Sequence, residues 1–484
     1  MSGNILDEKS DIKHAEFADI DDIDSAAEKK LLRKVDLHVV PALFALFLLA
    51  FLDRVNIGNA KIFGLEEELG MTGSQYSIGL MVFFVPYIIL EVPSNIMIRK
   101  IAPSTWLCGI MFLWGIATIG MGLIRNFGGL IAMRLLLGAF EAGLFPGCVY
   151  LISMYYKRHE LQWRMSLFFS ASILAGAFGG LLAYLIANLD GKGGYAGWRW
   201  IFIIEGLLTC VVAVILKYFV VDWPETAKFL TEEERALLSR RLTADVATAK
   251  MDRLDRAANK RIYGDWKIWC GTFMYMGALT TGYASSFFLP TIIKELGFTS
   301  TAAQVRSIPI FVVAAVLSLT VGWVADRVRH RYAFIMLGVA FGTVGYSICL
   351  GQNGLPTGVK YMACFFITSG GYMAQPVTLV WLSNNVGGHY KRSISSALQV
   401  GLGNCGGIIA SNVFISNQAP LYPVGYGVSL GMLLLTSITA TAFLFGLKHE
   451  NKMRDQGKRD WRLGEPDREV ENMGDDHPHF RFTL

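Results

Sequence analysis

Long apolar stretches alternate with short polar connections along most of the chain. Runs at residues 39–52, 107–124, 201–221 and 430–447 approach the ~20 residues that a helix needs to cross a ~30 Å hydrocarbon core. The same pattern along the whole sequence predicts spans near residues 38–61, 75–98, 104–124, 127–155, 162–189 and 199–220, then 266–294, 302–325, 332–351, 360–386, 391–416 and 424–447. We therefore expect an all-α membrane protein with twelve transmembrane helices.

The predicted spans form two sets of six with almost equal lengths, residues 38–220 and residues 266–447. Equal halves with the same number of spans indicate a parallel internal repeat, in which two six-helix bundles face each other. In proteins of this kind the substrate site lies near the middle of the bilayer, between the two halves.

Polar segments define the rest of the chain. Basic residues are concentrated in the tail 1–37 and in every second connection, which predicts that both termini are cytoplasmic. Segment 221–265 is expected to be a cytoplasmic linker, in which Thr231 and Glu234 form the capping box of an amphipathic helix. The cytoplasmic tail 448–484 is rich in charge and poor in aliphatic residues, so we expect it to be disordered.

Composition argues against an enzyme. The 484 residues are 53% hydrophobic and 17% charged, whereas a soluble domain has roughly 25% charged residues. All eight histidines lie in tails, loops or span ends, so no apolar segment offers one for a metal site or for activating a nucleophile. The seven cysteines lie in or beside apolar segments and are expected to be free thiols. We expect no metal, no cofactor other than a coupling proton, no nucleic-acid partner, and membrane lipid around a monomer.

Four ionisable residues lie inside two predicted spans, Asp53 and Arg54 in the first and Arg134 and Glu141 in the fourth. Each such group costs about 2.5–3.5 kcal/mol on insertion scales, so it requires a partner, an aqueous cavity or a function. A rise of 1.5 Å per residue places Asp53, Arg54 and Arg134 at similar depth, and Glu141 shares a helix face with Arg134. One interpretation is an anion site with proton-accepting carboxylates. The alternative is a fully paired structural network that locks the two spans together.

Each of three further polar residues in the first half could have either of two roles. Tyr87 lies near the middle of the second span, where it could donate a hydrogen bond to a substrate or simply pack. Glu91 lies one turn further on, and a structural or gating role is favoured there over proton coupling. Glu205 in the sixth span is equally open, because a bond to the backbone, to Arg199 or to Trp200 would satisfy it.

The connection after the eighth predicted span, Gly322-Trp-Val-Ala-Asp326-Arg327-Val-Arg-His-Arg331, resembles the signature loop of the major facilitator superfamily. Asp326 can face a helix N-terminus while Arg327 and Arg331 reach carboxylates or carbonyls. These three residues are therefore candidates for a cytoplasmic latch that breaks when the protein opens inward. The matching loop of the first half, residues 94–100, lacks the aspartate and the first glycine.

Three longer motifs resemble the anion:cation symporter family, and within it the fungal nicotinate, pantothenate and allantoate permeases. They are Leu52-Asp-Arg-Val-Asn56-Ile-Gly58, Arg134-Leu-Leu-Leu-Gly138-Ala-Phe-Glu141, and residues 384–397 followed by Gly401-Leu-Gly-Asn404. The resemblance covers residues 35–447 and implies twelve spans, two bundles and alternating access. It implies carboxylate binding at Arg54 and proton coupling at Asp53 and Glu141. The candidate substrate-binding residues are Arg54, Asn56, Tyr87, Arg134 and Asn404.

The sequence thus predicts proton-coupled uptake of a small organic anion, a monocarboxylate such as nicotinate, pantothenate or allantoate, across a fungal plasma membrane. A nutrient sensor that keeps the transporter fold without transporting is the alternative. The identity of the carboxylate, the choice of proton or sodium, and the choice of plasma membrane or vacuole stay open.

Overall fold

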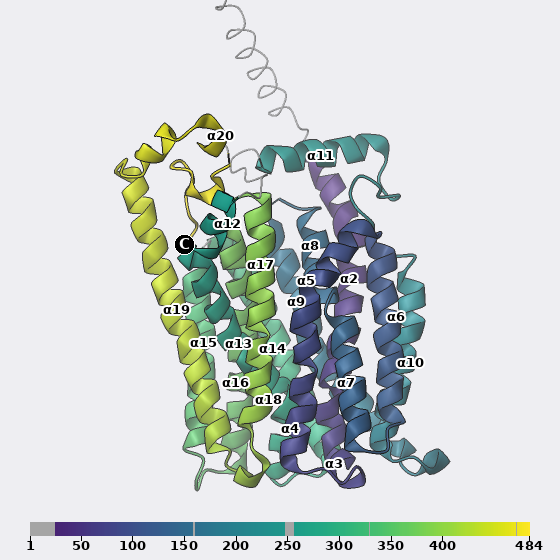
Figure 1. Cartoon of the computed structure of the whole chain (residues 1–484). Helices are drawn as coiled ribbons and strands as arrows, with labels where there is room; N and C mark the ends of the chain where they lie inside the picture. Colours follow the sequence, from purple (N-terminus) through teal and green to yellow (C-terminus); the bar gives the residue numbers. More distant parts are fainter. Residues whose placement is uncertain (1–24, 158–159, 247–255, 329, 471) are drawn as a thin grey trace, which may run out of the picture.

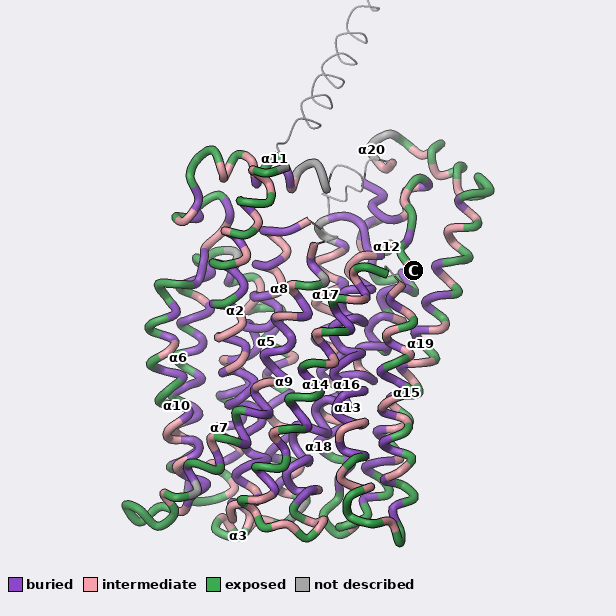
Figure 2. The backbone as a smooth tube through the Cα atoms, turned by 180° about the vertical axis from the view of Figure 1, so that it is seen from behind, coloured by how far each residue is buried: buried purple, intermediate pink, exposed green. Residues whose placement is uncertain are grey.

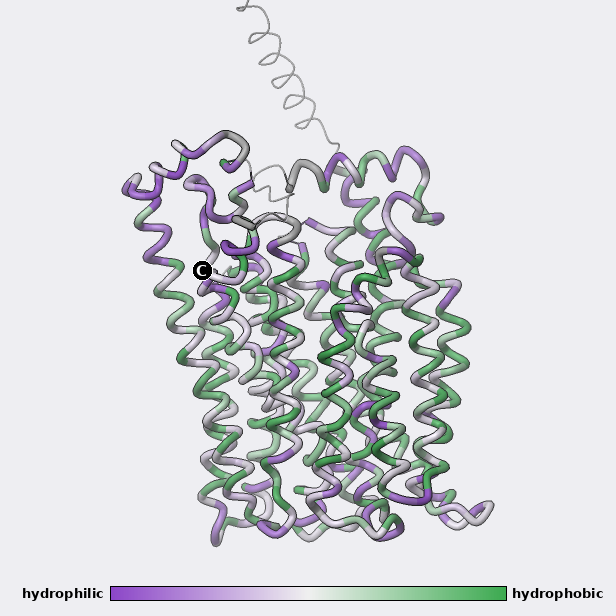
Figure 3. Tube along the Cα trace, in the orientation of Figure 1, coloured by the Kyte–Doolittle hydropathy of each residue, from purple (hydrophilic) through white to green (hydrophobic). Residues whose placement is uncertain are grey.

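The structure is a computed structural model that describes residues 25–157, 160–246, 256–328, 330–470 and 472–484. Every regular element in these ranges is a helix, and the long helices run roughly parallel in one bundle (Figure 1). Figure 3 shows apolar residues along the middle of the bundle and polar residues at its two ends. This distribution is the one expected of a chain that crosses a bilayer several times.

The first half of the chain contributes the helices up to α10. They are α2 (Ser25–Ile62), α3 (Leu65–Glu68), α4 (Gly73–Val82), α5 (Phe84–Lys100), α6 (Pro103–Gly122), α7 (Phe127–Glu141), α8 (Leu144–Ser153), α9 (Leu161–Ile186) and α10 (Gly197–Leu216). The linker then forms α11 (Glu232–Val246) and α12 (Arg256–Tyr263).

The second half contributes the helices from α13 onward. They are α13 (Trp266–Glu295), α14 (Ser300–Val328), α15 (Arg331–Leu350), α16 (Thr357–Asn384), α17 (His389–Gly403), α18 (Cys405–Val413), α19 (Pro423–Asp455) and α20 (Asp467–Val470). Short 3-10 helices follow in the loops and the tail at Ala187–Leu189, Lys192–Gly194, Ser416–Gln418, Asp460–Gly464 and Gly474–Asp476.

Nine helical segments in the described part are long and apolar enough to cross a membrane. They are α2, α4 with α5, α6, α7 with α8, α9, α10, α14, α15 and α19. Outer helices expose one apolar face, as Leu207, Val211 and Val214 do on α10. Figure 2 shows the exposed residues gathered on such outer helices and the buried ones on the inner helices. The chain is therefore an integral, multi-pass membrane protein.

The inner helices of the second half are more polar than the outer ones. Along α13 the hydroxyl residues Thr272, Thr280, Thr281, Ser285 and Ser286 are all buried. Helices α13, α16 and α17 with α18 pack against the apolar spans, so the buried polar side chains of these helices contact protein and not lipid. The expected total of twelve transmembrane helices includes these three and stays a prediction.

The two halves meet through several pairs of helices. Helix α9 packs along α14 and α16, α2 along α13, α4 and α5 against α17 and α18, and α8 against α17. The contact between α2 and α13 is very close, because a Cβ atom on Gly58 would lie only 2.7 Å from the carbonyl oxygen of Phe287. Any site between α2 and α13 is therefore shared by the two halves.

One end of the bundle holds the start of α2, the end of α19, and the helices α11, α12 and α20 (Figure 1). We call it the termini end, and the other one the far end. Helix α11 lies across the termini end, and its predicted capping box is confirmed. Glu234 donates its backbone N–H to the Thr231 hydroxyl over 3.2 Å, and the Thr231 N–H reaches the Glu234 carboxylate over 3.0 Å.

The expectation of a disordered tail is wrong for the residues that the structure describes. Fully buried Asp475 accepts hydrogen bonds from Lys267 (2.6 Å), from Lys391 (3.0 Å) and from the Gly387 backbone (3.0 Å). Arg454 donates to three backbone carbonyls of the tail. The tail is poor in aliphatic residues but has complementary charge, and that charge holds it against α13, α16 and α17.

Candidate functional site

The centre of the interface between the halves contains a buried ion pair. Arg54 of α2 donates from Nε to the Glu141 carboxylate of α7 over 3.0 Å, and a second, shorter contact joins Nη2 to the same oxygen. Arg54 is 3% exposed and Glu141 is 1% exposed. Two expected site residues are thus brought together, and the other carboxylate oxygen of Glu141 has no hydrogen-bond partner in the described part of the chain.

Aromatic rings surround the Arg54 guanidinium. The rings of Phe83 and Tyr87 have their centroids 4.9 Å from its central carbon. Such cation–π contacts stabilise a buried cation while leaving its N–H groups available for hydrogen bonds. The candidate residue Tyr87 therefore lies at the site, through its ring.

A hydrogen-bonded chain connects Arg54 with the other half of the protein. Arg54 donates from Nη1 to the hydroxyl of Tyr283 over 2.5 Å, and Tyr283 donates to Oδ1 of Asn404 over 3.0 Å. Tyr283 lies on α13, and Asn404 lies at the break between α17 and α18. The candidate residue Asn404 thus reaches the site through Tyr283.

Arg134 of α7 is only partly bonded. Its Nη1 donates to the backbone carbonyl of Arg54 over 3.3 Å, and the side chain is 1% exposed. Within the described residues its Nε and Nη2 groups have no hydrogen-bond partner. Unpaired buried donors are costly, so these two N–H groups can gain from an acceptor that is not part of the chain. With Arg54 and Arg134 facing one carboxylate, Glu141, the site has one excess positive charge.

Asp53 faces away from this site, into the first half. It accepts hydrogen bonds from the indole N–H of Trp114 (3.1 Å) and the hydroxyl of Thr209 (2.8 Å), on α6 and α10. The fully paired network of two arginines and two carboxylates is therefore not what the structure forms. Glu205 lies near enough to Asp53 to interact with it electrostatically.

The suggested partner of Glu205 is engaged elsewhere. Arg199 donates from Nε to Glu68 over 2.9 Å and from Nη1 to the carbonyl of Gly122 over 3.1 Å. Both carboxylate oxygens of Glu205 lack a hydrogen-bond partner among the residues described. Asn56, a candidate for substrate binding, lies toward α9, where its Oδ1 accepts a bond from Asn59 over 3.0 Å.

The expected gating residues lie at the termini end. Arg327 is exposed and its guanidinium lies 3.8 Å from the ring centroid of Trp323. The backbone N–H of buried Arg331 donates to the carbonyl of the final residue, Leu484, over 3.2 Å. Asp326 is half-buried on the last turn of α14. The structure therefore places the predicted latch beside the folded tail.

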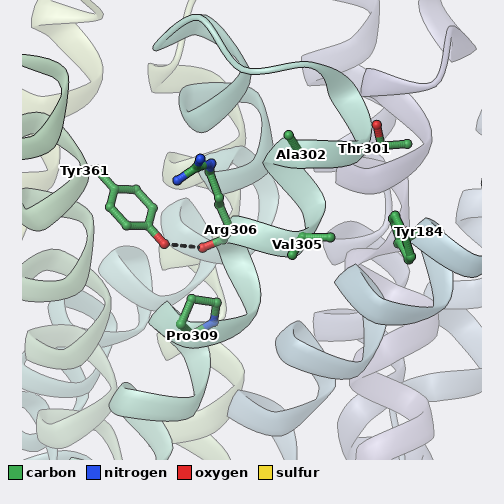
Figure 4. A pocket seen from close by; sticks show the side chains of 7 residues that line it. All are labelled: Tyr184, Thr301, Ala302, Val305, Arg306, Pro309 and Tyr361. Atoms are coloured by element: carbon green, nitrogen blue, oxygen red, sulfur yellow. Dashed lines mark hydrogen bonds between the residues drawn. The ribbon is translucent and has the colours of Figure 1, made fainter.

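A surface groove at the far end is separate from this central site. Figure 4 shows its lining by Tyr184, Thr301, Ala302, Val305, Arg306, Pro309 and Tyr361. The Tyr361 hydroxyl donates to the backbone carbonyl of Arg306 over 2.7 Å. Arg306 is exposed, so substitution of Arg306 can serve as a control for substitution of the buried Arg54.

Three residues of the central region were not identified from the sequence. Tyr283 completes the site from the second half, while Trp114 and Thr209 hold Asp53. Each is a polar group within an apolar span, and that signal could have identified them as partners of the charged residues.

Comparisons with known proteins agree with this architecture. Residues 43–411 match the pattern of the Major Facilitator Superfamily. The chain is 36% identical to the MFS-type transporter cnsO of Penicillium expansum, over 99% of this chain and 95% of that protein. It is 28% identical to the high-affinity nicotinic acid transporter of Saccharomyces cerevisiae, over 94% of this chain and 85% of that one. A solved D-xylose-proton symporter shares the fold with a TM-score of 0.63 at 15% identity, over 84% of this chain and 97% of that one.

These relatives confirm the predicted fold and the predicted family. The two fungal proteins are transporters and not enzymes, as the composition and the histidine positions led us to expect. The match extends over both halves and over the central ion pair. The chain belongs to the Major Facilitator Superfamily of membrane transporters.

Proposed function

We propose that this chain transports a small organic anion together with a proton, by alternating access, with both termini in the cytoplasm of a fungal cell and the substrate taken up across the plasma membrane. A monocarboxylate such as nicotinate, pantothenate or allantoate is the expected substrate. The observation that supports this most directly is the excess positive charge at the Arg54–Glu141–Arg134 site.

Anion binding follows from the hydrogen bonds that the site leaves open. Arg134 keeps two N–H groups without a partner among the described residues, and the Arg54 guanidinium is held by one carboxylate oxygen of Glu141. A guanidinium fits a carboxylate through two parallel hydrogen bonds. A substrate carboxylate can therefore bind Arg134 and displace Glu141 from Arg54.

Proton coupling follows from that displacement. Once Glu141 leaves Arg54 it is a buried carboxylate without a cation, and such a group takes a proton instead of staying charged. Arrival of the anion thus favours protonation of Glu141, and departure of the proton favours return of the ion pair. Asp53, held apart by Trp114 and Thr209, is the second expected proton-binding group.

Alternating access follows from the position of the site between the halves. Arg54 and Glu141 belong to the first half, while Tyr283 and Asn404 belong to the second. Tyr283 contacts Arg54 directly, so rocking of one half against the other changes the surroundings of the guanidinium. The curated nicotinic acid transporter supports a carboxylate substrate for this chain by analogy.

The test is substitution of Arg54 by lysine, which keeps the charge but cannot copy the planar fork. Hydrogen bonds to charged groups contribute roughly 1.5–3 kcal/mol, so Arg54→Lys should weaken binding about ten- to a hundredfold. Uptake of labelled nicotinate, pantothenate and allantoate by the full chain, with and without a pH gradient, first identifies the substrate. The dissociation constants of that substrate for the wild type and for Arg54→Lys then give the loss of affinity.

An amide analogue of the identified substrate completes a double-mutant cycle. The analogue should lose a similar factor with the wild-type protein and little more with Arg54→Lys. Additive losses would mean that Arg54 never touches the carboxylate. Arg306→Lys, in the exposed far-end groove, is the matched control and should bind like the wild type. Uptake that ignores both a proton gradient and an uncoupler would refute the proposal itself.

A further inference from the structure

A second buried carboxylate lies at the interface between the halves, outside the ion-paired site. Glu91 of α5 is 1% exposed. Neither of its carboxylate oxygens has a hydrogen-bond partner in the ranges that the structure describes. It lies one helical turn beyond Tyr87, or about 6 Å closer to the termini end than the residue that packs on Arg54.

The other half of the protein covers Glu91. A Cβ atom built on Gly401 of α17 would lie 3.3 Å from one carboxylate oxygen and 4.0 Å from the other. A side chain at Gly401 would thus be in tight contact with the carboxyl group, which packs directly on α17. Glu91 is therefore buried by contact between the halves, and separation of α5 from α17 would expose it to water.

In the described part of the chain, no cation from the helices that pack on α5 pairs with Glu91, and the basic residues of α5 itself, Arg99 and Lys100, lie about 12 Å or more along the helix. Helices α4, α6, α8 and α18 contain no charged residue. Their titratable groups are Tyr76, Cys108, Cys148, Tyr150 and Cys405. The groups that interact electrostatically with Glu91 are the tyrosines Tyr87, Tyr275 and Tyr283.

The charged residues of the two remaining neighbours belong to other sites. On α7, Arg134 bonds to the Arg54 carbonyl and Glu141 pairs with the Arg54 guanidinium. On α17 the charges lie in the first turn, at Lys391 and Arg392, about 14 Å along the helix from Gly401. Lys391 there pairs with aspartates of the tail and of the linker. An ionised Glu91 would thus be a bare buried charge, and such a group becomes neutral by binding a proton.

The regular helix is interrupted near Glu91 in both α5 and α17. Pro93 lies inside α5, two residues from Glu91, and a proline in a helix removes a backbone hydrogen bond and favours a kink. Helix α17 ends at Gly403, where α18 begins after Asn404. The contact between α5 and α17 therefore lies where both helices can bend, as a gate at the termini end requires.

We propose that Glu91 is a proton-operated gate, which must bind a proton before the termini end can close and which releases that proton when the end opens. The proton comes from water in the opening and returns to the same water, so the gate adds no transported charge. The inference rests on the proposed alternating access. It makes closure depend on the pH at the termini end, independently of the proton carried by Glu141.

The test measures opening of the termini end directly and needs no substrate. Spin labels are attached through an unnatural amino acid at the exposed positions Leu37 on α2 and Val328 on α14, so that all seven native cysteines remain. Pulsed electron paramagnetic resonance of the full chain in lipid nanodiscs gives their distance distribution from about pH 5 to about pH 9. The wild type should shift to longer distances as pH rises.

Glu91→Gln keeps the shape of the neutral acid and cannot ionise, so its distances should stay short at every pH. Glu205→Gln is the matched control: it neutralises another buried, unpartnered carboxylate away from the interface between the halves, and it should shift like the wild type. A Glu91→Gln protein that opens with pH like the wild type overturns the proposal. A wild type that does not open with pH overturns it as well.

An infrared measurement keeps the test valid if Glu91→Gln fails to fold. The carbonyl stretch of a protonated carboxylic acid should be present in the closed wild type, disappear as the termini end opens, and move in frequency in Glu91→Asp. A spectrum without that band contradicts the proposal. Neither readout involves transport. Failure of the gate with intact pH-driven uptake would therefore be distinguishable from failure of the proposed function.

Discussion

The folded tail depends on one buried carboxylate, and Asp475→Asn should release it. Asp475 lies between Lys267 and Lys391, which also contact Asp265 at 3.0 and 2.6 Å. These four residues form a neutral cluster at the termini end, and none is more than 8% exposed. Replacing one carboxylate by an amide leaves two buried lysines with a single aspartate.

The size of the effect follows from the bonds that are lost. Asparagine can still accept the Gly387 N–H, but it cannot replace the two bonds from Lys267 and Lys391 to a charged oxygen. At about 1.5–3 kcal/mol for each, the loss is about 3–6 kcal/mol, close to the 3–5 kcal/mol typical of a broken buried pair. Docking of the tail should weaken at least a hundredfold, since each factor of ten corresponds to about 1.4 kcal/mol.

The dependence on pH has a definite sign. Burial by itself would raise the pKa of Asp475, but Lys267 and Lys391 outweigh it and hold the pKa of that carboxyl well below its usual range. An acid with a lowered pKa in the folded state contributes its full stability above its unfolded value of about 3.9. That contribution is lost as pH falls through the lowered value. The contribution of Asp475 to wild-type docking should therefore be constant above about pH 4.

Hydrogen exchange of the full chain, followed by mass spectrometry, measures docking at residues 472–484. Those amides should exchange at least a hundredfold faster in Asp475→Asn, while the spans keep their protection. Asp476→Asn is the matched control, because Asp476 is partly exposed, lies 3.6 Å from Arg462, and such a pair contributes little. Equal protection of the tail in Asp475→Asn and the wild type would refute the reasoning.

Two further predictions concern the interface between the halves. Glu141→Gln removes the carboxylate that we propose accepts the proton, so pH-driven accumulation of the substrate should disappear while exchange across equal pH persists. Loss of exchange as well would contradict this role. Gly58→Ala would place a Cβ atom 2.7 Å from the Phe287 carbonyl oxygen and should destabilise the closed bundle by about 1–3 kcal/mol, measured as a lower midpoint of thermal unfolding. Gly109→Ala on α6 is its control: the new Cβ atom has nothing within 4 Å, and alanine favours a helix more than glycine does, so its midpoint should not fall below that of the wild type.

Hydropathy predicted where the chain crosses the membrane better than where its helices end. The first span was expected at residues 38–61, but α2 begins at Ser25, and the last was expected to end at residue 447, but α19 continues to Asp455. Polar residues with good helix propensity extend a helix into water without changing the apolar pattern. The order of the tail escaped prediction for another reason. Its stability comes from Lys267 and Lys391, which are distant in sequence.

The sequence predicted which charged residues lie in the central region, but not which of them pair with each other. Counting Asp53, Arg54, Arg134 and Glu141 gives two charges of each sign, and similar depth suggested a single cluster. Successive residues on a helix differ by about 100° in direction, however, so Asp53 and Arg54 cannot face the same neighbour. Arg54 lies toward α7 and the second half, and Asp53 lies toward α6 and α10.

This separation changes what the site can do. If all four charges were paired, an incoming anion would compete with both carboxylates and gain little. With Asp53 bonded to Trp114 and Thr209, Arg134 keeps donors that lack partners in the described part of the protein. In the transport proposed above, the anion displaces one carboxylate, Glu141, and that carboxylate must bind a proton or stay charged in an apolar interior. Helix geometry at two adjacent residues therefore separates the structural lock, which needs Asp53 in the cluster, from the proposed proton-coupled anion site, which needs it elsewhere.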